Sequence, residues 1–183
     1  VAYDLETDGT DPLTANVRCV GLGTEDEALV VEIESIVGTP LASPEQQAAL
    51  KKIFRTFFLE PHVPVLGHNA GQYDRLVMEQ WTGITPNLSC DTILLHLLAD
   101  NELPHNLGFV GSFYTDNPEA WKADHTAVEA KTDEELHIYC GKDVCVTARI
   151  ARPLARDVKK REQMHLLSRE HILQHLGTTM QRN

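Results

Sequence analysis

The stretch Val1-Ala2-Tyr3-Asp4-Leu5-Glu6, at the beginning of the 183-residue chain, decides the fold. Its residues are apolar up to an acidic end, and they predict a short buried strand over Val1–Leu5. Side chains alternate between the two faces of a strand, so Asp4 and Glu6 point to the same side. Two carboxylates that share one face of a buried strand end are electrostatically costly unless a cation lies between them. A solvated strand end followed by an acidic turn is the alternative explanation of this segment.

Further strand and helix signals follow along the chain. Apolar segments on both sides of residues 24–27 suit an antiparallel hairpin, and Ser43-Pro44-Glu45 has the composition of a helix start. Pro153 favours a break after the last long helix. Strands followed by mixed strand and helix units predict an α/β fold with a mixed sheet covered by helices. The expected strands are residues 1–5, 17–23, 28–33 and 63–66, and the expected helices are residues 44–59, 73–81, 92–98, 107–114 and 133–150, with a final amphipathic helix that carries Leu166, Leu167, Leu173, Leu176 and Met180.

The composition is that of a globular protein with an acidic surface. Hydrophobic residues make up 42% of the chain and charged residues 23%, which excludes intrinsic disorder. No apolar run approaches the roughly 18 residues of a membrane span, so we expect no membrane association. A formal net charge of −11 argues against a sequence-independent coat on DNA, because such binding needs clustered lysine and arginine. It leaves open an enzyme that reaches phosphates through metal ions held by carboxylates.

Three further residues add to the acidic pair. Asp74 begins a predicted helix after a loop that contains glycine and asparagine, where the helix dipole favours an acid. Tyr139 and Asp143 lie at positions i and i+4 of a predicted helix, so they share one face. Four carboxylates from separate segments that converge at one edge of the sheet would supply hard oxygen ligands for two Mg²⁺ or Mn²⁺ ions. Two ions about 3.5–4 Å apart would clamp the attacking and leaving oxygens of a phosphodiester.

Three short motifs resemble those of the DEDD exonuclease superfamily, in its tyrosine-bearing branch. They are Asp4-x-Glu6, Gly67-His68-Asn69-x-x-x-Tyr73-Asp74 and Tyr139-x-x-x-Asp143. The second and third motifs are most similar to the proofreading domain of phage-type family A DNA polymerases, and the resemblance covers roughly residues 1–156. Relative to bacterial polymerase I, the second motif has one extra residue, a length that phage members share. Further similarity lies in Cys90-Asp91-Thr92 and in Leu103-Pro104-His105-Asn106-Leu107-Gly108.

The resemblance implies a ribonuclease H-like α/β fold, with a mixed central β-sheet flanked by α-helices. It also implies a 3′→5′ exonuclease that uses two divalent metal ions, Mg²⁺ or Mn²⁺. Asp4, Glu6, Asp74 and Asp143 would be the metal ligands, with Asp4 bridging both ions. Tyr139 has an unperturbed pKa of about 10 and is a poor general base near neutral pH, so we assign it to orienting the attacking water. The expected catalytic residues are therefore Asp4, Glu6, Asp74, Tyr139 and Asp143.

The family positions also imply a binding site for the 3′-terminal nucleotide. Thr7 and Asn69 would hold that nucleotide, Tyr73 would lie near the strand, and His68 is the fourth substrate-binding candidate. Asp91 is expected to cap a helix or to support the site rather than to bind metal. The resemblance implies these four substrate-binding residues by their positions in the motifs.

The biological role that the resemblance implies is proofreading by a DNA polymerase. The substrate would be single-stranded or frayed DNA 3′ ends, and the products would be 5′-dNMPs. Residues 1–157 would form the exonuclease domain, and residues 158–183 a helical arm that leads toward a polymerase domain of the same longer chain. Four cysteines without a CxxC pair predict reduced thiols in a reducing cytoplasm, that of the host if a phage encodes the protein. We expect a monomer.

Two other functions are compatible with the same residues. The first is an RNA-trimming 3′→5′ exoribonuclease of the same superfamily, which would keep the fold and the metal ions and change only the substrate. The second is a catalytically silent domain that retains the fold as a nucleic-acid interaction platform. The presence of all four carboxylates and of the tyrosine argues against the silent domain.

Overall fold

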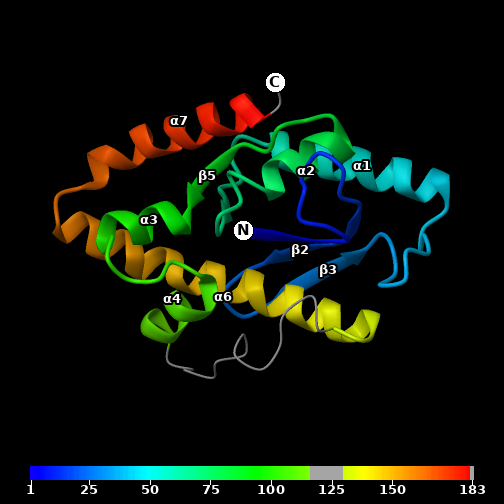
Figure 1. The fold of residues 1–183 in the computed structure, drawn as a ribbon, viewed down its shortest axis with the longest axis horizontal. Helices are drawn as coiled ribbons and strands as arrows, with labels where there is room; N and C mark the ends of the chain where they lie inside the picture. The colour runs from blue at the N-terminus through cyan, green and yellow to red at the C-terminus, as the bar shows by residue number, and fades with distance from the viewer. Residues whose placement is uncertain (116–129, 182–183) are drawn as a thin grey trace.

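The structure is a computed structural model that describes residues 1–115 and 130–181 (Figure 1). Its described strands are β1 (Ala2–Thr7), β2 (Val17–Gly23), β3 (Ala28–Glu32), β4 (Val65–Gly67) and β5 (Leu88–Asp91). They form one sheet in the order β3-β2-β1-β4-β5. The β3-β2-β1 half is antiparallel, whereas β4 and β5 run parallel to β1. The predicted α/β fold with a mixed central sheet is confirmed.

Helices cover both faces of this sheet. Within the described residues they are α1 (Pro44–Leu59), α2 (Asp74–Thr82), α3 (Thr92–Ala99), α4 (Leu107–Tyr114), α6 (Asp133–Lys160) and α7 (Met164–Gln181). Helices α1 and α2 pack on one face, and α6 crosses the opposite face in contact with β1, β2, β3 and β4 (Figure 1). Helices α3 and α4 pack against α6, and α7 lies beside α3. None of the described helices combines the length and the apolar character that crossing a membrane requires.

Two helix starts follow the rules that the sequence suggested. Ser43 caps α1: its hydroxyl accepts a hydrogen bond from the Gln46 amide, and the Gln46 side chain accepts one from the Ser43 amide. This reciprocal pair satisfies two amides that the first helical turn leaves without partners. Asp91 caps α3 by accepting from the Ile93 amide at 3.2 Å. The expected capping role of Asp91 is confirmed.

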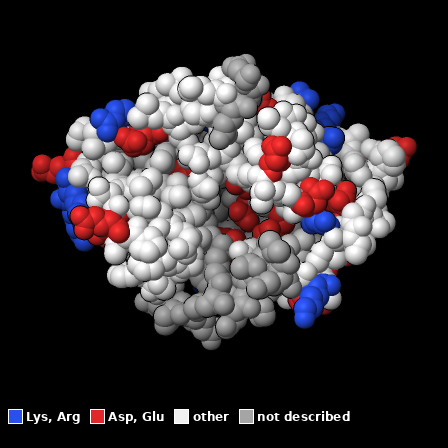
Figure 2. Space-filling view, viewed as in Figure 1, with Lys and Arg blue, Asp and Glu red and all other residues white. Residues whose placement is uncertain are grey.

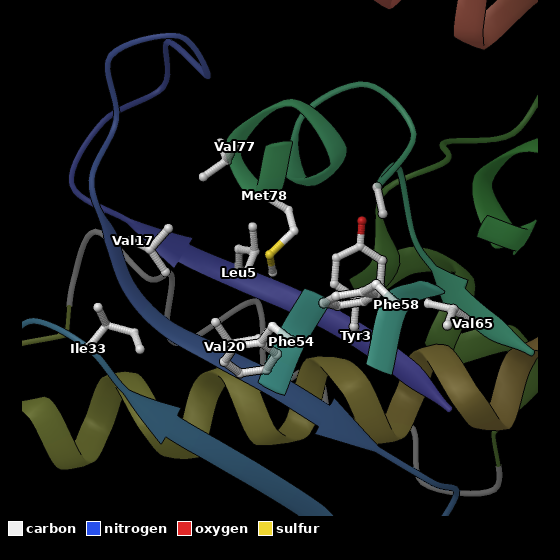
Figure 3. Packing of buried hydrophobic residues seen from close by; sticks show 11 residues of the cluster. Tyr3, Leu5, Val17, Val20, Ile33, Phe54, Phe58, Val65, Val77 and Met78 are labelled. Carbon is white, nitrogen blue, oxygen red and sulfur yellow. The ribbon is translucent and has the colours of Figure 1, made fainter. Parts of the chain in front are cut away.

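The main hydrophobic core fills the space between the sheet and helices α1 and α2. Tyr3 and Leu5 of β1 point into it, away from α6, and meet Phe54 and Phe58 of α1 (Figure 3). The Tyr3 and Phe58 rings pack edge to face with their centroids 5.0 Å apart. Met78 of α2 closes the cluster and is fully buried. Because alternate residues of β1 are anchored here, the intervening Asp4 side chain is directed to the other face of the sheet.

Helix α6 approaches β2 so closely that position 21 requires glycine. A Cβ on Gly21 would lie 2.7 Å from Cys140 Sγ and 3.0 Å from Val144 Cγ1. Gly21 is the partner of Asp4 in the antiparallel register, and Cys19 is the partner of Glu6. Paired residues of antiparallel strands point to the same side, so both carboxylates lie on the face that α6 covers.

The predicted helix break near Pro153 is wrong, because α6 continues through this proline to Lys160. An interior proline removes one backbone hydrogen bond and costs about 3 kcal/mol. Ile150, Leu154 and Val158 recur every four residues on both sides of it, and each is fully buried in a second cluster with α3 and α4. Burying three such side chains contributes roughly 1.5–3 kcal/mol each, which exceeds the cost of the proline.

The C-terminal helix forms as predicted, but its buried face is not the apolar one. Gln174 and Thr178 are the buried residues of α7, whereas Leu173, Leu176 and Met180 are more than half exposed. The helix lies back against α3 and the end of β5 (Figure 1), where Gln174 and His171 both bond to Asp91. The division between residues 1–157 and 158–183 stays a prediction, and the boundary falls inside α6.

Candidate active site

Asp4 and Glu6 lie beside Cys140 of α6 at the end of β1. One carboxylate oxygen from each acid and the Cys140 sulfur all lie within 4.8 Å of one another. Glu6 is buried and Asp4 is half-buried. The hydrogen bond with Cys19 and burial hold the pKa of the Cys140 thiol well above its usual value, and the charges of Asp4 and Glu6 raise it further. The two carboxylates are therefore the hard oxygen donors of this group, a set that suits a divalent cation.

Asp74 joins this pair from the first turn of α2. Its Oδ1 accepts a hydrogen bond at 2.9 Å from the amide of Leu5, the residue between Asp4 and Glu6. Burial, together with the negative charges of Asp91 and Asp143, raises the pKa of the Asp74 carboxyl to about 7, although hydrogen bonds from backbone amides oppose this rise. A cation that binds beside this buried carboxyl stabilises its ionised form, which burial and the neighbouring acids otherwise disfavour.

Tyr139 and Asp143 stand on the face of α6 that is turned toward the sheet. Asp143 is only 4% exposed and Tyr139 is half-buried. Cys140 is three residues from Asp143 and touches β1 and β2, which fixes the side of the helix that faces the acids. The charge of Asp143 raises the pKa of Asp74, so the acids of α6 and α2 are close enough to interact electrostatically. The four predicted acids of β1, α2 and α6 thus lie near one end of β1, and Tyr139 lies four residues before Asp143 on α6.

One face of the molecule has a depression with an acidic lining. Figure 2 shows acidic side chains lining a depression near the middle of this face, whereas the lysines and arginines visible in this view lie toward its rim. The depression lies over the region between α2 and α6 of Figure 1. A phosphodiester would meet negative potential there, and only bound cations would reverse it.

The predicted residues Thr7 and Tyr73 come together next to the acids. Their hydroxyl oxygens are 2.6 Å apart, and both lie within hydrogen-bond distance of the Gly9 carbonyl oxygen. Burial raises the pKa of the Tyr73 hydroxyl, so it stays a neutral hydrogen-bonding group at physiological pH. These hydrogen bonds hold the turn that follows β1 against Tyr73, the residue before α2.

Asn69 and His68 occupy different environments although they are neighbours. The Asn69 side chain is exposed, and its backbone has a positive φ of 62°, a conformation that asparagine adopts more readily than most residues. The ring nitrogens of His68 are each 2.8 Å from a protein oxygen, the Thr92 hydroxyl and the His105 carbonyl. His68 therefore connects its loop to α3 and to the segment before α4, whereas Asn69 faces solvent beside the site.

Sequence reasoning missed two features of the site. The first is Cys140, for which the sequence predicts only a reduced thiol, although its place between Tyr139 and Asp143 puts it near the site by helical spacing. The second feature is the role of Asp91 as an acceptor for the loop that contains Asn69 and Asp74. No local pattern signals that role, because the hydrogen bonds join residues about twenty positions apart.

Comparison with known proteins identifies the family. Residues 1–159 match the family model described as 3′-5′ exonuclease. No curated protein sequence matches the chain. Among solved structures, NrnC of Brucella melitensis with bound Mg²⁺ superposes with a TM-score of 0.72 at 19% identity, over 98% of this chain and 83% of that one.

Two further structures share the fold. RNase D of Escherichia coli superposes with a TM-score of 0.69 at 14% identity, over 97% of this chain and 44% of that one. A structure of the POL domain of Pol1 from M. smegmatis superposes with a TM-score of 0.57 at 16% identity, over 92% of this chain and 26% of that one. At such identities these structures establish the ribonuclease H-like fold and nothing finer.

The family match spans most of the chain and includes all three motifs. It covers the strand end with Asp4 and Glu6, the start of α2 with Asp74, and the face of α6 with Tyr139 and Asp143. The DEDD exonucleases use divalent metal ions, and the buried acids described above are donors of the kind such ions require. The chain therefore belongs to the 3′-5′ exonuclease family of the DEDD superfamily, and it is a DEDD-type 3′-5′ exonuclease.

Proposed function

We propose that this exonuclease removes deoxynucleotides from single-stranded or frayed DNA 3′ ends as the proofreading module of a phage-type family A DNA polymerase. The observation that carries the proposal is the pairing of Tyr139 with Asp143 on α6, in a chain whose second motif has the length found in phage polymerases. The acidic lining of the depression supports selection of an unpaired end, because tight binding along the phosphates of a duplex needs clustered lysine and arginine. A mispaired end frays at a lower cost than a paired one.

Four carboxylates are the proposed metal ligands. Asp4, Glu6 and Asp143 would hold one divalent ion, and Asp4 and Asp74 would serve the second. Two such ions supply an activated water and stabilise the charge that develops on the leaving 3′ oxygen. Mg²⁺ and Mn²⁺ both fit a set of carboxylate oxygens.

The remaining residues act on the water and on the nucleotide. The Tyr139 hydroxyl would orient the attacking water by a hydrogen bond, because a neutral phenol is a poor base near pH 7. Thr7, Tyr73 and the exposed Asn69 would hold the terminal nucleotide at the acids. His68, with both ring nitrogens near protein oxygens, supports the position of Asn69 rather than contacting substrate.

RNA is the second candidate substrate. It is favoured by the likeness to ribonucleases of the same fold, among them RNase D of Escherichia coli, described as an exoribonuclease involved in structured RNA processing. The structure of the POL domain of Pol1 from M. smegmatis, described as a complex with DNA primer-template, favours DNA instead, and it has the same fold within a much longer chain. The 2′-hydroxyl is the group by which a protein distinguishes the two nucleic acids.

A direct comparison of DNA and RNA tests the proposed substrate. We expect kcat/KM with Mn²⁺ to be at least about tenfold higher for a single-stranded DNA oligonucleotide than for the RNA of the same sequence, a difference of about 1.4 kcal/mol. A duplex with a mispaired 3′ end should also be shortened faster than the fully paired duplex. The Asp143→Asn protein, purified in parallel, controls for contaminating nucleases.

The outcomes separate the candidate functions. An RNA substrate cleaved as well as or better than DNA would overturn the proofreading assignment while leaving the exonuclease in place. Failure to shorten either oligonucleotide in Mn²⁺ would instead favour a silent interaction domain.

Tyr139→Phe tests the proposed role of the phenol. Because the hydroxyl only orients the water, we expect kcat to fall by about 10- to 100-fold, with residual activity that is readily measured. The matched control is Tyr114→Phe, since Tyr114 bonds to Asp157 at the far end of α6 and should leave cleavage unchanged. Complete loss of activity in Tyr139→Phe, at unchanged thermal stability, would mean that the hydroxyl does more than orient water.

A further inference from the structure

Asp91 is a fully buried carboxylate that holds the loop between β4 and α2. Its Oδ1 accepts from the amides of Asn69 at 2.7 Å and Ile93 at 3.2 Å, and its Oδ2 accepts from the amide of Gly71 at 3.0 Å. The fourth donor is the Gln174 amide Nε2, 2.8 Å from Oδ2. A buried carboxylate needs such donors on both oxygens, because an unpaired buried charge is costly.

Gln174 reaches this carboxylate from α7, 83 positions away in the sequence. The neighbouring turn of the same helix adds His171, whose Nε2 accepts from the Asp91 amide at 3.2 Å. Gln174 also packs directly on the loop: a Cβ on Gly71 would lie 2.0 Å from its Oε1 and 2.2 Å from its Cδ. The C-terminal helix thus touches the loop twice, once through Asp91 and once through Gly71.

The inward face of α7 combines this polar contact with Leu167, which packs against the second hydrophobic cluster. An amphipathic helix buries its apolar side when burial alone decides its orientation. Here Gln174 and Thr178 face inward while Leu173, Leu176 and Met180 stay exposed. A buried, charge-assisted hydrogen bond to a carboxylate is among the stronger polar contacts in proteins, so it stabilises this orientation of the helix.

We propose that Gln174 is a positioning residue for the exonuclease: through Asp91 and Gly71 it fixes the loop that presents Asn69 to the 3′-terminal nucleotide. The inference rests on the proposed role of Asn69 in holding that nucleotide. Asp74, at the other end of the loop, has its own tether, because its Oδ1 accepts from the Leu5 amide of β1. Gln174 therefore acts on nucleotide binding and leaves the metal ligands in place.

The first test is Gln174→Met, which keeps the volume of the side chain and removes the donor. We expect KM for a single-stranded oligonucleotide to rise at least about fivefold, since a charge-assisted hydrogen bond is lost. The value of kcat and the Mn²⁺ concentration for half-maximal activity should stay within about twofold, because Asp74 keeps its own tether. The matched control is Gln80→Met, an exposed position on α2, which should change neither quantity.

Amide hydrogen exchange gives a readout that does not depend on activity. In Gln174→Met, the amides of Asn69 and Gly71 should exchange at least about tenfold faster than in the parent protein. The Leu5 amide, which bonds to Asp74, should keep its exchange rate and so report that the metal end of the loop is undisturbed. Equal rates at Asn69 and Gly71 in both proteins would overturn the proposal.

Gly71→Ala tests the same contact from the loop side and serves if Gln174→Met folds poorly. The added methyl would displace the flexible end of Gln174 rather than a backbone atom, so the fold should be retained. We expect the same rise in KM and the same faster exchange at Asn69. Because both changes break one contact, the double variant should be no worse than the more impaired single variant.

The outcomes distinguish this inference from the proposed function. Additive KM effects in the double variant, or a loss confined to kcat, would overturn the positioning role of Gln174. Absence of exonuclease activity in the parent protein would instead contradict the proposed function, and the exchange experiment would still decide whether Gln174 holds the loop.

Discussion

Asp143→Asn should abolish 3′-end cleavage, lowering kcat in Mn²⁺ by at least about 1,000-fold, and leave a folded protein that is more heat-stable without metal. A lost metal ligand removes several kcal/mol of transition-state stabilisation, and about 4 kcal/mol corresponds to this factor. The gain in stability has a separate cause. Asp143 is buried near the Asp74 carboxyl, so the neutral amide removes repulsion that only bound cations otherwise relieve.

The measurement combines single-turnover cleavage of a 3′-labelled oligonucleotide with thermal unfolding in EDTA. Glu134→Gln is the matched control, because Glu134 is an exposed acid on the same helix and its neutralisation should leave both measurements unchanged. Asp4→Asn should behave as Asp143→Asn does. An Asp143→Asn protein that kept more than one tenth of the parent activity would exclude this carboxylate from the metal site.

Asp74→Asn should make the metal-free protein more stable at high pH and leave its stability at low pH unchanged. The Asp74 pKa is raised from 3.8 to about 7 in the folded protein. Between about pH 4 and pH 7 the folded state therefore holds a proton that the unfolded chain has released, and the free energy of unfolding falls as the pH rises. Asparagine does not ionise, keeps an oxygen that can accept from Leu5, and removes this penalty.

Thermal unfolding in EDTA at several pH values checks this expectation. The Tm difference between Asp74→Asn and the parent should be near zero at pH 4 and reach roughly 8–16 °C at pH 8, which corresponds to about 4 kcal/mol in a chain of this size. Mn²⁺ should raise the Tm of the parent much more than that of the variant. Asp11→Asn is the control, because this exposed aspartate also accepts a backbone amide. A difference independent of pH would show that Asp74 does not titrate in this range.

Local sequence patterns predicted most of the elements, and they failed where contacts distant in sequence decide. Strand β2 and helix α1 have the predicted bounds, and β3 ends one residue earlier than predicted, because alternation, capping residues and prolines act within a few positions. Strand β5 was missed, since Leu88–Asp91 contains few apolar residues and is held as an edge strand by β4. A helix end was predicted near Pro153 because the energetic cost of a proline in a helix is a local property. The burial of Ile150 and Leu154, which offsets this cost, depends on packing against α3 and α4.

Some features of the candidate site could likewise be predicted from local spacing, whereas others depend on contacts distant in the sequence. Asp4 with Glu6, and Tyr139 with Asp143, follow from spacing within one strand and one helix, so their shared faces could be predicted. That Asp74 reaches the Leu5 amide depends on β4 lying parallel to β1, which no single segment specifies. The bond between Gln174 and Asp91 could not be predicted at all, because the apolar pattern of α7 indicates the opposite face.

The absence of a side chain at Gly21 limits how this enzyme can change during evolution. The acids of the site belong to different elements, and the close contact of α6 with β2 helps to hold Asp143 near the acids of the other elements. A single methyl group at position 21 would meet Cys140 and Val144 and push the helix outward, although no acid would be altered. Lineages that lose nuclease activity could thus do so by a substitution that a survey of metal ligands alone would overlook, and a protein engineer could use the same position for that purpose.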